Sequence, residues 1–318
     1  MKIGIAGSGK IVRTALEAIN QSENVKCTCI CVRECSLEKG QTLASQYEIK
    51  EIFTNYEDFL SKGDFDFVYI GLPNTLHFQY AKQALESGKN VICEKPFTIN
   101  SEELEILIYR AREYGLYIFE AISTIHMPNF IYFKENLRLL ENIKLVKCNF
   151  SQYSSRYDDY LQGNVHSVFK PDEYGGALYD MNIYNIHIVA SLFGVPEKAA
   201  YFPNLGPNGV DTSGIAILEY KDFICELTAA KDSYNESGTT VQGKNGYMKI
   251  EGPANVCDKI VTCIDGKTFK TDLQYSDKNR LFYEFETFDM IYENKDYGKC
   301  IELMEHSLNV MKIVDMMV

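Results

Sequence analysis

Lys2-Ile3-Gly4-Ile5-Ala6-Gly7-Ser8-Gly9-Lys10-Ile11-Val12 is a short apolar run that ends in a glycine-rich turn and passes into an amphipathic segment reaching Asn20. In a strand–turn–helix unit of this kind, Gly7 permits the tight turn and Gly9 lets a ligand approach the backbone. The following helix presents unpaired N–H groups to an anion. Val12 stands where glycine or alanine is usual in such sites. The alternative is therefore a strand–turn–helix unit with a glycine turn that binds no ligand. We predict a dinucleotide phosphate site made by Gly7, Ser8, Gly9, Lys10 and Ile11.

The order of strand-like and helix-like segments predicts two domains. Up to residue 121, short β-like runs alternate with amphipathic segments, which is typical of a parallel sheet built by right-handed crossovers. Beyond residue 122, a helix-like segment over 176–193 precedes several alternating runs joined by turn residues, which indicates an antiparallel sheet. The predicted class is α/β: an N-terminal Rossmann doubly wound parallel sheet over 1–121 and a C-terminal α+β domain with a mostly antiparallel open sheet over 122–318.

Composition narrows the choice of partner and compartment. The 318 residues carry 32 Lys and Arg against 44 Asp and Glu, a formal net charge of −12, which argues against nucleic acid or an anionic membrane as partner. No stretch approaches the roughly 20 apolar residues of a membrane helix, and the N-terminus lacks the apolar core of a secretion signal. We therefore expect a cytoplasmic protein with a small-molecule substrate, ten free cysteines and no metal site.

The end of the second expected strand bears on which dinucleotide binds. An acidic residue there would hydrogen-bond the ribose of NAD, whereas this strand ends Cys31-Val32-Arg33-Glu34. Arg33 can pair with a 2′-phosphate and Lys10 adds charge nearby, so NADP is favoured. Glu34 keeps NAD open, and the alternative is that Arg33 and Glu34 form a solvated loop pair.

Three motifs stand at the ends of later strands of the first domain. Gly71-Leu72-Pro73-Asn74-Thr75-Leu76-His77 and Glu94-Lys95-Pro96 follow their strands, and Glu120-Ala121 ends the last one. Each stands at the carboxyl end of a strand, where open α/β sheets bind ligands. The second domain contributes residues 175–187, which read Gly-Gly-Ala-Leu-Tyr-Asp-Met-Asn-Ile-Tyr-Asn-Ile-His. Together with the glycine turn, this order resembles the glucose-fructose oxidoreductase, inositol dehydrogenase and rhizopine catabolism (Gfo/Idh/MocA) family over nearly the whole chain.

The resemblance implies an NAD(P)-binding first domain and a second domain whose open sheet helps form a homodimer or homotetramer. It places Lys95 beside the nicotinamide and the substrate, as a catalytic residue that also contacts the cofactor. At such a place a lysine can lend its charge to a neighbouring hydroxyl. The strand-end motifs would supply the other cofactor contacts, Leu72, Pro73, Asn74, His77, Glu94 and Pro96.

Asp180, Tyr184 and His187 are spaced i, i+4 and i+7, so on an α-helix they fall within an arc of about 60°. The resemblance implies that Asp180 and the residue four positions later point at the substrate. Tyr184 with help from Lys95, or His187 alone, would transfer the proton. The alternative is that these polar residues form hydrogen bonds in the interface between the two domains.

Two positions depart from the family pattern. After Glu120-Ala121, dihydrodiol-like members carry an arginine near the substrate, whereas this chain has His126, a further candidate substrate contact. Asn182 stands where the family has glycine. The substrate of this chain could therefore differ from those of the named relatives.

These features lead to one expected function and two rivals. We expect hydride transfer between nicotinamide and a hydroxyl or carbonyl carbon of a sugar, cyclic polyol or dihydrodiol-like substrate, with NADP or NAD as cofactor. A non-catalytic dinucleotide sensor on the same fold is the alternative, although such a sensor need not keep Lys95, Asp180 and Tyr184. A hydrolase with Cys93 as nucleophile is disfavoured, because no histidine partner is evident and Cys93 is expected at a buried strand end.

Overall fold

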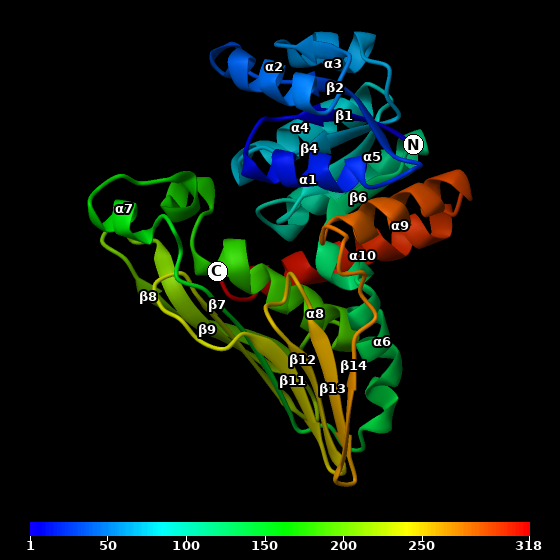
Figure 1. The fold of residues 1–318 in the computed structure, drawn as a ribbon. Helices are drawn as coiled ribbons and strands as arrows, with labels where there is room; N and C mark the ends of the chain where they lie inside the picture. Colours follow the sequence, from blue (N-terminus) through cyan, green and yellow to red (C-terminus); the bar gives the residue numbers. More distant parts are fainter. The chain divides into compact units, whose positions relative to one another are not determined.

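The computed structural model describes residues 1–318, which form two compact units. The first unit comprises residues 1–123 and 276–308, and the second comprises residues 124–275 and 309–318. The sequence predicts one boundary near residue 121, whereas the chain returns to its first unit near the C-terminus. The returning segment holds α9 (Phe282–Glu293) and most of α10 (Tyr297–Asp315), orange and red in Figure 1. No helix combines the length and apolarity that crossing a membrane requires.

Sheet A of the first unit has six parallel strands in the order β3-β2-β1-β4-β5-β6. The direction in which strands are added reverses between β1 and β4, and open sheets of this kind bind ligands at that point. The predicted doubly wound parallel sheet is confirmed. The strands are β1 (Lys2–Ala6), β2 (Lys26–Cys31), β3 (Glu51–Phe53), β4 (Phe67–Ile70), β5 (Asn90–Glu94) and β6 (Ile118–Ala121).

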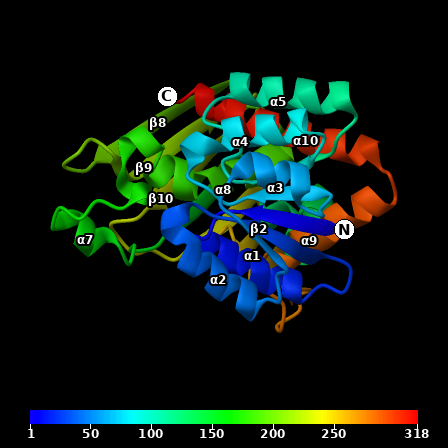
Figure 2. The ribbon, with the colours of Figure 1, turned by 90° about the horizontal axis from the view of Figure 1, so that it is seen from above.

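Helices cover sheet A, which explains why its central strands are apolar on both faces. All four residues of β4 are buried, and α4 and α5 pack side by side (Figure 2). The Phe288 ring of α9 stacks on the Phe119 ring of β6, with centroids 4.5 Å apart. This packing is the physical reason why residues 276–308 belong to the first unit. The other helices here are α1 (Lys10–Asn20), α2 (Leu37–Gln46), α3 (Tyr56–Lys62), α4 (Asn74–Glu86) and α5 (Ser101–Tyr114).

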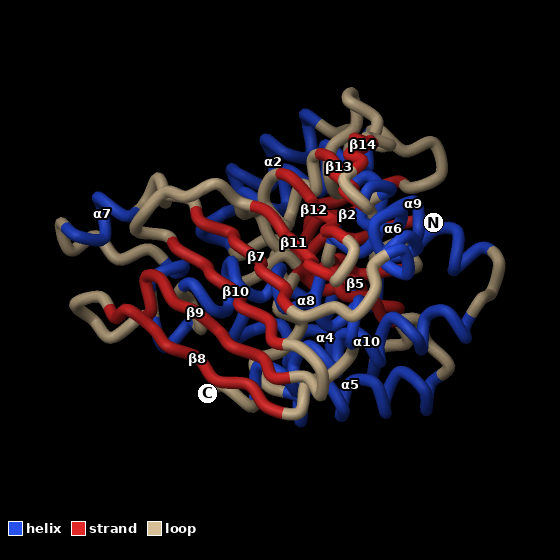
Figure 3. The backbone as a smooth tube through the Cα atoms, turned by 90° about the horizontal axis from the view of Figure 1, so that it is seen from below, coloured by secondary structure: helices blue, strands red, loops and turns tan.

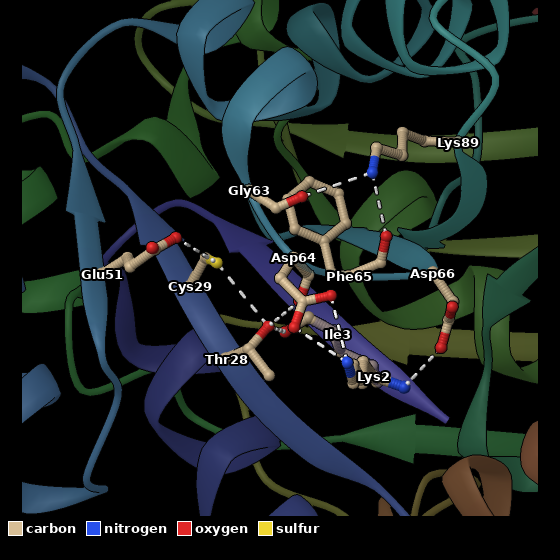
Figure 4. A network of polar contacts seen from close by, with 10 residues as sticks. All are labelled: Lys2, Ile3, Thr28, Cys29, Glu51, Gly63, Asp64, Phe65, Asp66 and Lys89. Atoms are coloured by element: carbon tan, nitrogen blue, oxygen red, sulfur yellow. Dashed lines mark hydrogen bonds and ion pairs between the residues drawn. The ribbon is translucent and has the colours of Figure 1, made fainter.

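Polar contacts tie the strands together at the end of sheet A opposite the glycine turn (Figure 4). The Lys2 ammonium lies 2.8 Å from the Asp64 carboxylate, and the Thr28 hydroxyl donates to the Asp64 carbonyl at 2.7 Å. Lys89 donates to the Phe65 carbonyl at 3.0 Å and lies over the Phe65 ring. These contacts stabilise the sheet at the amino ends of its strands, whereas the predicted site lies at their carboxyl ends.

Sheet B of the second unit has eight strands in the order β14-β13-β12-β11-β7-β10-β9-β8. Only β10 and β7 pair in parallel, so the predicted mostly antiparallel sheet is confirmed. The strands are β7 (Leu145–Ser151), β8 (Lys198–Leu205), β9 (Asp211–Glu219), β10 (Ile224–Ala230), β11 (Gly238–Gly243), β12 (Gly246–Glu251), β13 (Lys259–Ile264) and β14 (Lys267–Thr271).

Helices cover one face of sheet B. The helical residues 178–193 contact β7 and β10, and α6 contacts β12 and β13. Figure 3 shows β8, β9, β10, β7 and β11 from the side on which no helix lies over them. The helices of this unit are α6 (Pro128–Asn136), α7 (Tyr157–Leu161) and α8 (Ile183–Phe193).

The predicted helix over residues 176–193 is not a uniform α-helix. Leu178–Asn182 form a π-helical turn, and α8 begins at Ile183. A π turn has a wider ring of backbone hydrogen bonds and so changes the angular spacing of side chains along it. The predicted arc of about 60° therefore applies to Tyr184 and His187 on α8, but not to Asp180 in the π turn.

Candidate functional site

The glycine turn after β1 depends on backbone contacts that a side chain would prevent. Gly7 has φ +125°, and a Cβ there would lie 2.4 Å from the Gly71 carbonyl oxygen. The Gly7 N–H donates to the Cys31 carbonyl at 2.9 Å, which joins the ends of β1 and β2. A Cβ on Gly71 would lie 2.7 Å from a methyl of the buried Val12. The close packing that the usual third glycine provides is thus provided by Gly71, after β4.

The N-terminus of α1 fits a dinucleotide pyrophosphate. Its N-cap residue is Gly9, no side chain caps it, and its first turn contains no acidic residue. A Cβ on Gly9 would meet no atom within 4 Å, so the backbone is open to a ligand. Ser8 and Ile11 are half-buried around the turn, and Lys10 is exposed beside it. The first-turn N–H groups and Lys10 give this end of the helix a positive potential.

Arg33 lies just past the end of β2, in extended backbone before a short 3-10 turn. Its side chain and that of Glu34 are both exposed. The turn is closed by the Ser36 N–H, which donates to the Arg33 carbonyl at 2.7 Å. The exposed Arg33 guanidinium can therefore be reached by a ligand phosphate from outside the chain.

His77 connects the loops that follow β4 and β5. Its ring is buried, with Nε2 2.9 Å from the Leu72 carbonyl oxygen and Nδ1 2.8 Å from the Pro96 carbonyl oxygen. Pro73 is the N-cap residue of α4 and is exposed, and Asn74 is the first residue of that helix. The ring nitrogens of His77 thus contact backbone, whereas the chain around Leu72, Pro73 and Asn74 faces outward.

Lys95 follows β5 and is half-buried, and the Lys95–Pro96 peptide bond is cis. Its neighbour Glu94 is buried and accepts a hydrogen bond from the Tyr69 hydroxyl. Burial raises the pKa of Glu94, while that hydrogen bond and the Lys95 charge act in the opposite direction. Burial, and next the Glu94 charge, raise the pKa of Glu284 on α9 well above its usual value. Lys95 therefore stands at a strand end next to the buried carboxyl group of Glu94.

Cys93 is not an activated nucleophile. Its side chain is fully buried in β5, with Sγ 3.9 Å from the Phe97 carbonyl. Burial raises the pKa of the Cys93 thiol well above its usual value. The reactive thiolate is therefore disfavoured, which argues against the hydrolase alternative.

Asp180 is held by a residue that the sequence reasoning missed. The Lys231 ammonium, whose side chain is 2% exposed, lies 2.7 Å from Asp180 Oδ2 and donates to the Val168 carbonyl at 2.8 Å. It also lies 4.7 Å from the centroid of the Phe169 ring. Lys231 directly follows β10, but a single lysine after a strand usually solubilises a surface, so its sequence position gives no signal.

Tyr184 and His187 belong to a buried stretch of α8, with Tyr184 5% and His187 0% exposed. Two asparagines attach this helical region to β10. Asn182 donates to the Leu227 carbonyl at 3.0 Å, and Asn185 donates to the Thr228 carbonyl at 3.0 Å. The asparagine at the family's glycine position is therefore an anchor for the helix that carries the candidate proton-transfer residues.

The predicted site residues form two groups, one in each unit. In the first unit, the glycine turn, Arg33, the loop after β4 and Lys95 all lie at the carboxyl edge of sheet A. In the second unit, Asp180, Tyr184 and His187 lie on one helical segment. His126, 7% exposed, lies in a 3-10 turn before α6 and also belongs to the second unit.

Known proteins resemble this chain over most of its length. The description "Oxidoreductase family, NAD-binding Rossmann fold" matches residues 1–121, and "GFO/IDH/MocA C-terminal domain" matches residues 140–249. YgjR of Escherichia coli (strain K12), named an uncharacterized oxidoreductase, is 32% identical over 288 residues, which are 91% of this chain and 87% of that protein. IolU of Bacillus subtilis (strain 168), a scyllo-inositol 2-dehydrogenase (NADP(+)), is 30% identical over 316 residues, covering 99% of this chain and 95% of IolU.

A solved structure shares the whole fold. KijD10, a 3-ketoreductase from Actinomadura kijaniata solved with NADP and TDP-benzene, has a TM-score of 0.84 and 21% identity, covering 100% of this chain and 96% of its own. The dinucleotide turn of the first unit and the open sheet of the second agree with both matched descriptions. The chain therefore belongs to the Gfo/Idh/MocA family of NAD(P)-dependent oxidoreductases.

Proposed function

We propose that the chain oxidises a ring hydroxyl of a cyclic polyol or sugar with NADP, or reduces the corresponding ketone. The observation that carries the proposal is the position of Lys95, half-buried at the end of β5 on the same sheet edge as the glycine turn. The name of IolU, similar over 99% of this chain, supports inositol-like substrates and NADP.

The proposed chemistry divides between the two units. Bound NADP supplies the hydride acceptor. Lys95 places a positive charge beside the substrate oxygen. Tyr184, as a phenolate stabilised by that charge, or a neutral His187 takes the hydroxyl proton while the carbon gives its hydride to NADP. The alcohol thereby loses two electrons and two hydrogens and becomes a ketone, and the reverse steps reduce it. Asp180, held by Lys231, orients the substrate from the π turn. His126 is a further proposed substrate contact.

The test is nicotinamide absorbance with a panel of inositols, sugars and cyclic diols. Lys95→Ala should lower kcat/KM by about 10²- to 10⁴-fold, the range for loss of a group that assists proton transfer. Lys82→Ala is the matched control, because this lysine is 41% exposed and its ion pair with Glu86 is loose, at 3.9 Å. Unchanged turnover in Lys95→Ala would refute the mechanism. Saturable NADP binding with no turnover of any substrate in the panel would favour the alternative function, a non-catalytic dinucleotide sensor.

We infer that Arg33 selects NADP by pairing with the 2′-phosphate. Arg33→Ala should weaken NADP binding by about 10- to 100-fold, the worth of one charge-assisted hydrogen bond, and should leave NAD binding nearly unchanged. Arg110→Ala, which removes an exposed ion pair on α5, is the control. Equal affinity of the wild type for NADP and NAD would contradict this assignment.

We propose that the outer face of sheet B forms a homodimer or homotetramer. Phe202 of β8 and Ile215 of β9 pair across strands and are 62% and 40% exposed. Ile224 of β10 and Leu145 of β7 also pair and are 45% and 43% exposed. Four exposed apolar side chains on neighbouring strands favour a protein partner. Light scattering on Phe202→Asp should show dissociation, and a monomeric wild type would refute the proposal.

We also propose a cytoplasmic location. The ten cysteines are all free thiols, and several lie in the core. Chains rich in unpaired thiols suit a reducing compartment. Fractionation of the source cells with an antibody to this chain would test the location, and recovery outside the cytoplasm would contradict it.

A further inference from the structure

One peptide group next to Lys95 is held at both of its ends. The Pro96 carbonyl oxygen lies 2.8 Å from Nδ1 of His77, and the N–H of Phe97, which belongs to the same peptide group, donates to Glu120 Oε1 at 3.0 Å. His77 is 0% and Glu120 4% exposed. His77 comes from the first turn of α4 and Glu120 from β6, so two separate elements fix the backbone that carries Lys95.

The second ring nitrogen of His77 also faces a carbonyl oxygen, that of Leu72, at 2.9 Å. Carbonyl oxygens only accept hydrogen bonds, and a neutral imidazole has a single N–H to donate. With a neutral ring, one bare nitrogen would face the lone pairs of a carbonyl at hydrogen-bond distance. Only the doubly protonated ring satisfies both contacts.

The charges around His77 act in both directions. Burial is the largest influence and leaves the pKa of His77 below its usual value; the positive charge of Lys95 acts the same way, whereas the two carbonyl acceptors and Glu120 act in the opposite direction. The geometry favours the charged ring because the peptide dipole between His77 and Glu120 has its oxygen toward the cation and its N–H toward the carboxylate. Such an alignment offsets part of the cost of burying both charges.

We propose that doubly protonated His77 and ionised Glu120 are positioning residues, which hold the Pro96–Phe97 peptide between opposite charges and so fix Lys95 at the cofactor. The inference rests on the proposed function of Lys95. The sequence predicts a direct cofactor contact for His77, whereas this proposal assigns it a positioning role, because both of its ring nitrogens contact backbone carbonyl oxygens.

The direct test is nitrogen NMR of the full chain labelled at its five histidines. We expect both ring nitrogens of His77 to be protonated at neutral pH, with the signal assigned by its loss in His77→Asn. If that variant does not fold, the signal is assigned by replacing the other four histidines one at a time. A neutral His77 ring with one bare nitrogen would overturn the proposal.

A second arm tests the role of Glu120. Glu120→Gln keeps an oxygen for the Phe97 N–H but removes the charge, so His77 should lose its second proton at a lower pH than in the wild type. An unchanged His77 titration in Glu120→Gln would overturn the proposed charge pair. Neither NMR experiment needs turnover, so this inference and the proposed function can fail separately.

Kinetics test the connection to Lys95. His77→Asn should lower kcat by about 10- to 100-fold, because small displacements of a catalytic group are costly. The alkaline limb of the pH profile should also move to higher pH, since loss of a neighbouring positive charge favours the charged form of Lys95. A fall in kcat with no movement of that limb would indicate a merely structural role and would overturn the proposal.

Discussion

At the residue scale, the sequence predicts best those side chains whose chemistry is tied to a local backbone pattern. The glycine turn is such a case, because Gly7 adopts a positive φ immediately after a strand. Lys231 could not be predicted, because its partner Asp180 lies 51 residues earlier in the chain. Glu284 could not be predicted either, since nothing in its helical neighbourhood distinguishes a buried carboxyl from an exposed one. The burial and the partners of such residues depend on contacts between segments that are distant in the sequence.

Gly7 and Gly9 should respond differently to alanine. Gly7→Ala places a Cβ 2.4 Å from the Gly71 carbonyl at φ +125°, so it should lower the free energy of unfolding by about 1–3 kcal/mol or more. Gly9→Ala meets no atom, so folding should be unchanged while NADP binding weakens. Urea unfolding and cofactor titration measure the two effects. A stable Gly7→Ala variant would contradict the geometry of the turn.

Glu284 should make stability depend on pH. Burial raises the pKa of Glu284 in the folded chain well above the usual 4.5, near which it ionises in the unfolded chain, so between these two pKa values the carboxyl stays protonated only in the folded chain. The contribution of Glu284 to the free energy of unfolding is therefore fully present below pH 4.5. It is progressively lost as the pH rises toward the folded-state pKa. Glu284→Gln cannot ionise and should flatten this slope from about pH 5 upward. Parallel slopes for both chains in urea unfolding would contradict a buried, neutral Glu284.

At the element scale, the sequence predicts elements that have an apolar face and misses those that have none. β3 has only three residues, and four of the five residues of β14 are exposed, so neither shows a pattern. The helix over 176–193 is predicted, but its π turn is not, because apolar spacing does not distinguish an α turn from a π turn over five residues. The residues of this turn contact β10, a later segment of the chain.

Asn182→Ala tests the attachment of this helical segment to β10. The variant removes the hydrogen bond that Asn182 donates to the Leu227 carbonyl in the core, so the free energy of unfolding should fall by about 1–3 kcal/mol. Asn164→Ala, at an exposed position, is the control and should change it by less than about 0.5 kcal/mol. Equal effects of the two substitutions in urea unfolding would show that the Asn182 bond contributes nothing.

At the scale of the whole molecule, the two-domain plan is predictable and the path of the chain between the units is not. Local patterns place a change near residue 121, but the return of residues 276–308 depends on packing between α9 and sheet A. Leu281, Phe285, Phe288 and Ile291 all belong to the core cluster of the first unit. No local pattern tells which of two cores a C-terminal apolar helix will join.

A fragment of residues 1–121 should therefore not fold as a stable domain. Without α9, the surface around Phe119 that receives Phe288 is exposed to water. We expect such a fragment to lack a cooperative thermal transition and to bind NADP poorly. A cooperative transition like that of the full chain would show that the C-terminal helices are dispensable for the first unit.

We propose that Lys95 from the first unit and Tyr184 or His187 from the second act on the same substrate oxygen. A crystal structure of the full chain with NADP and an inositol-type substrate tests this most directly. We expect the Lys95 ammonium and either the Tyr184 hydroxyl or a His187 ring nitrogen to lie within about 3.2 Å of one substrate oxygen at the nicotinamide. A substrate bound at the nicotinamide that contacts Lys95 but neither Tyr184 nor His187 would contradict it.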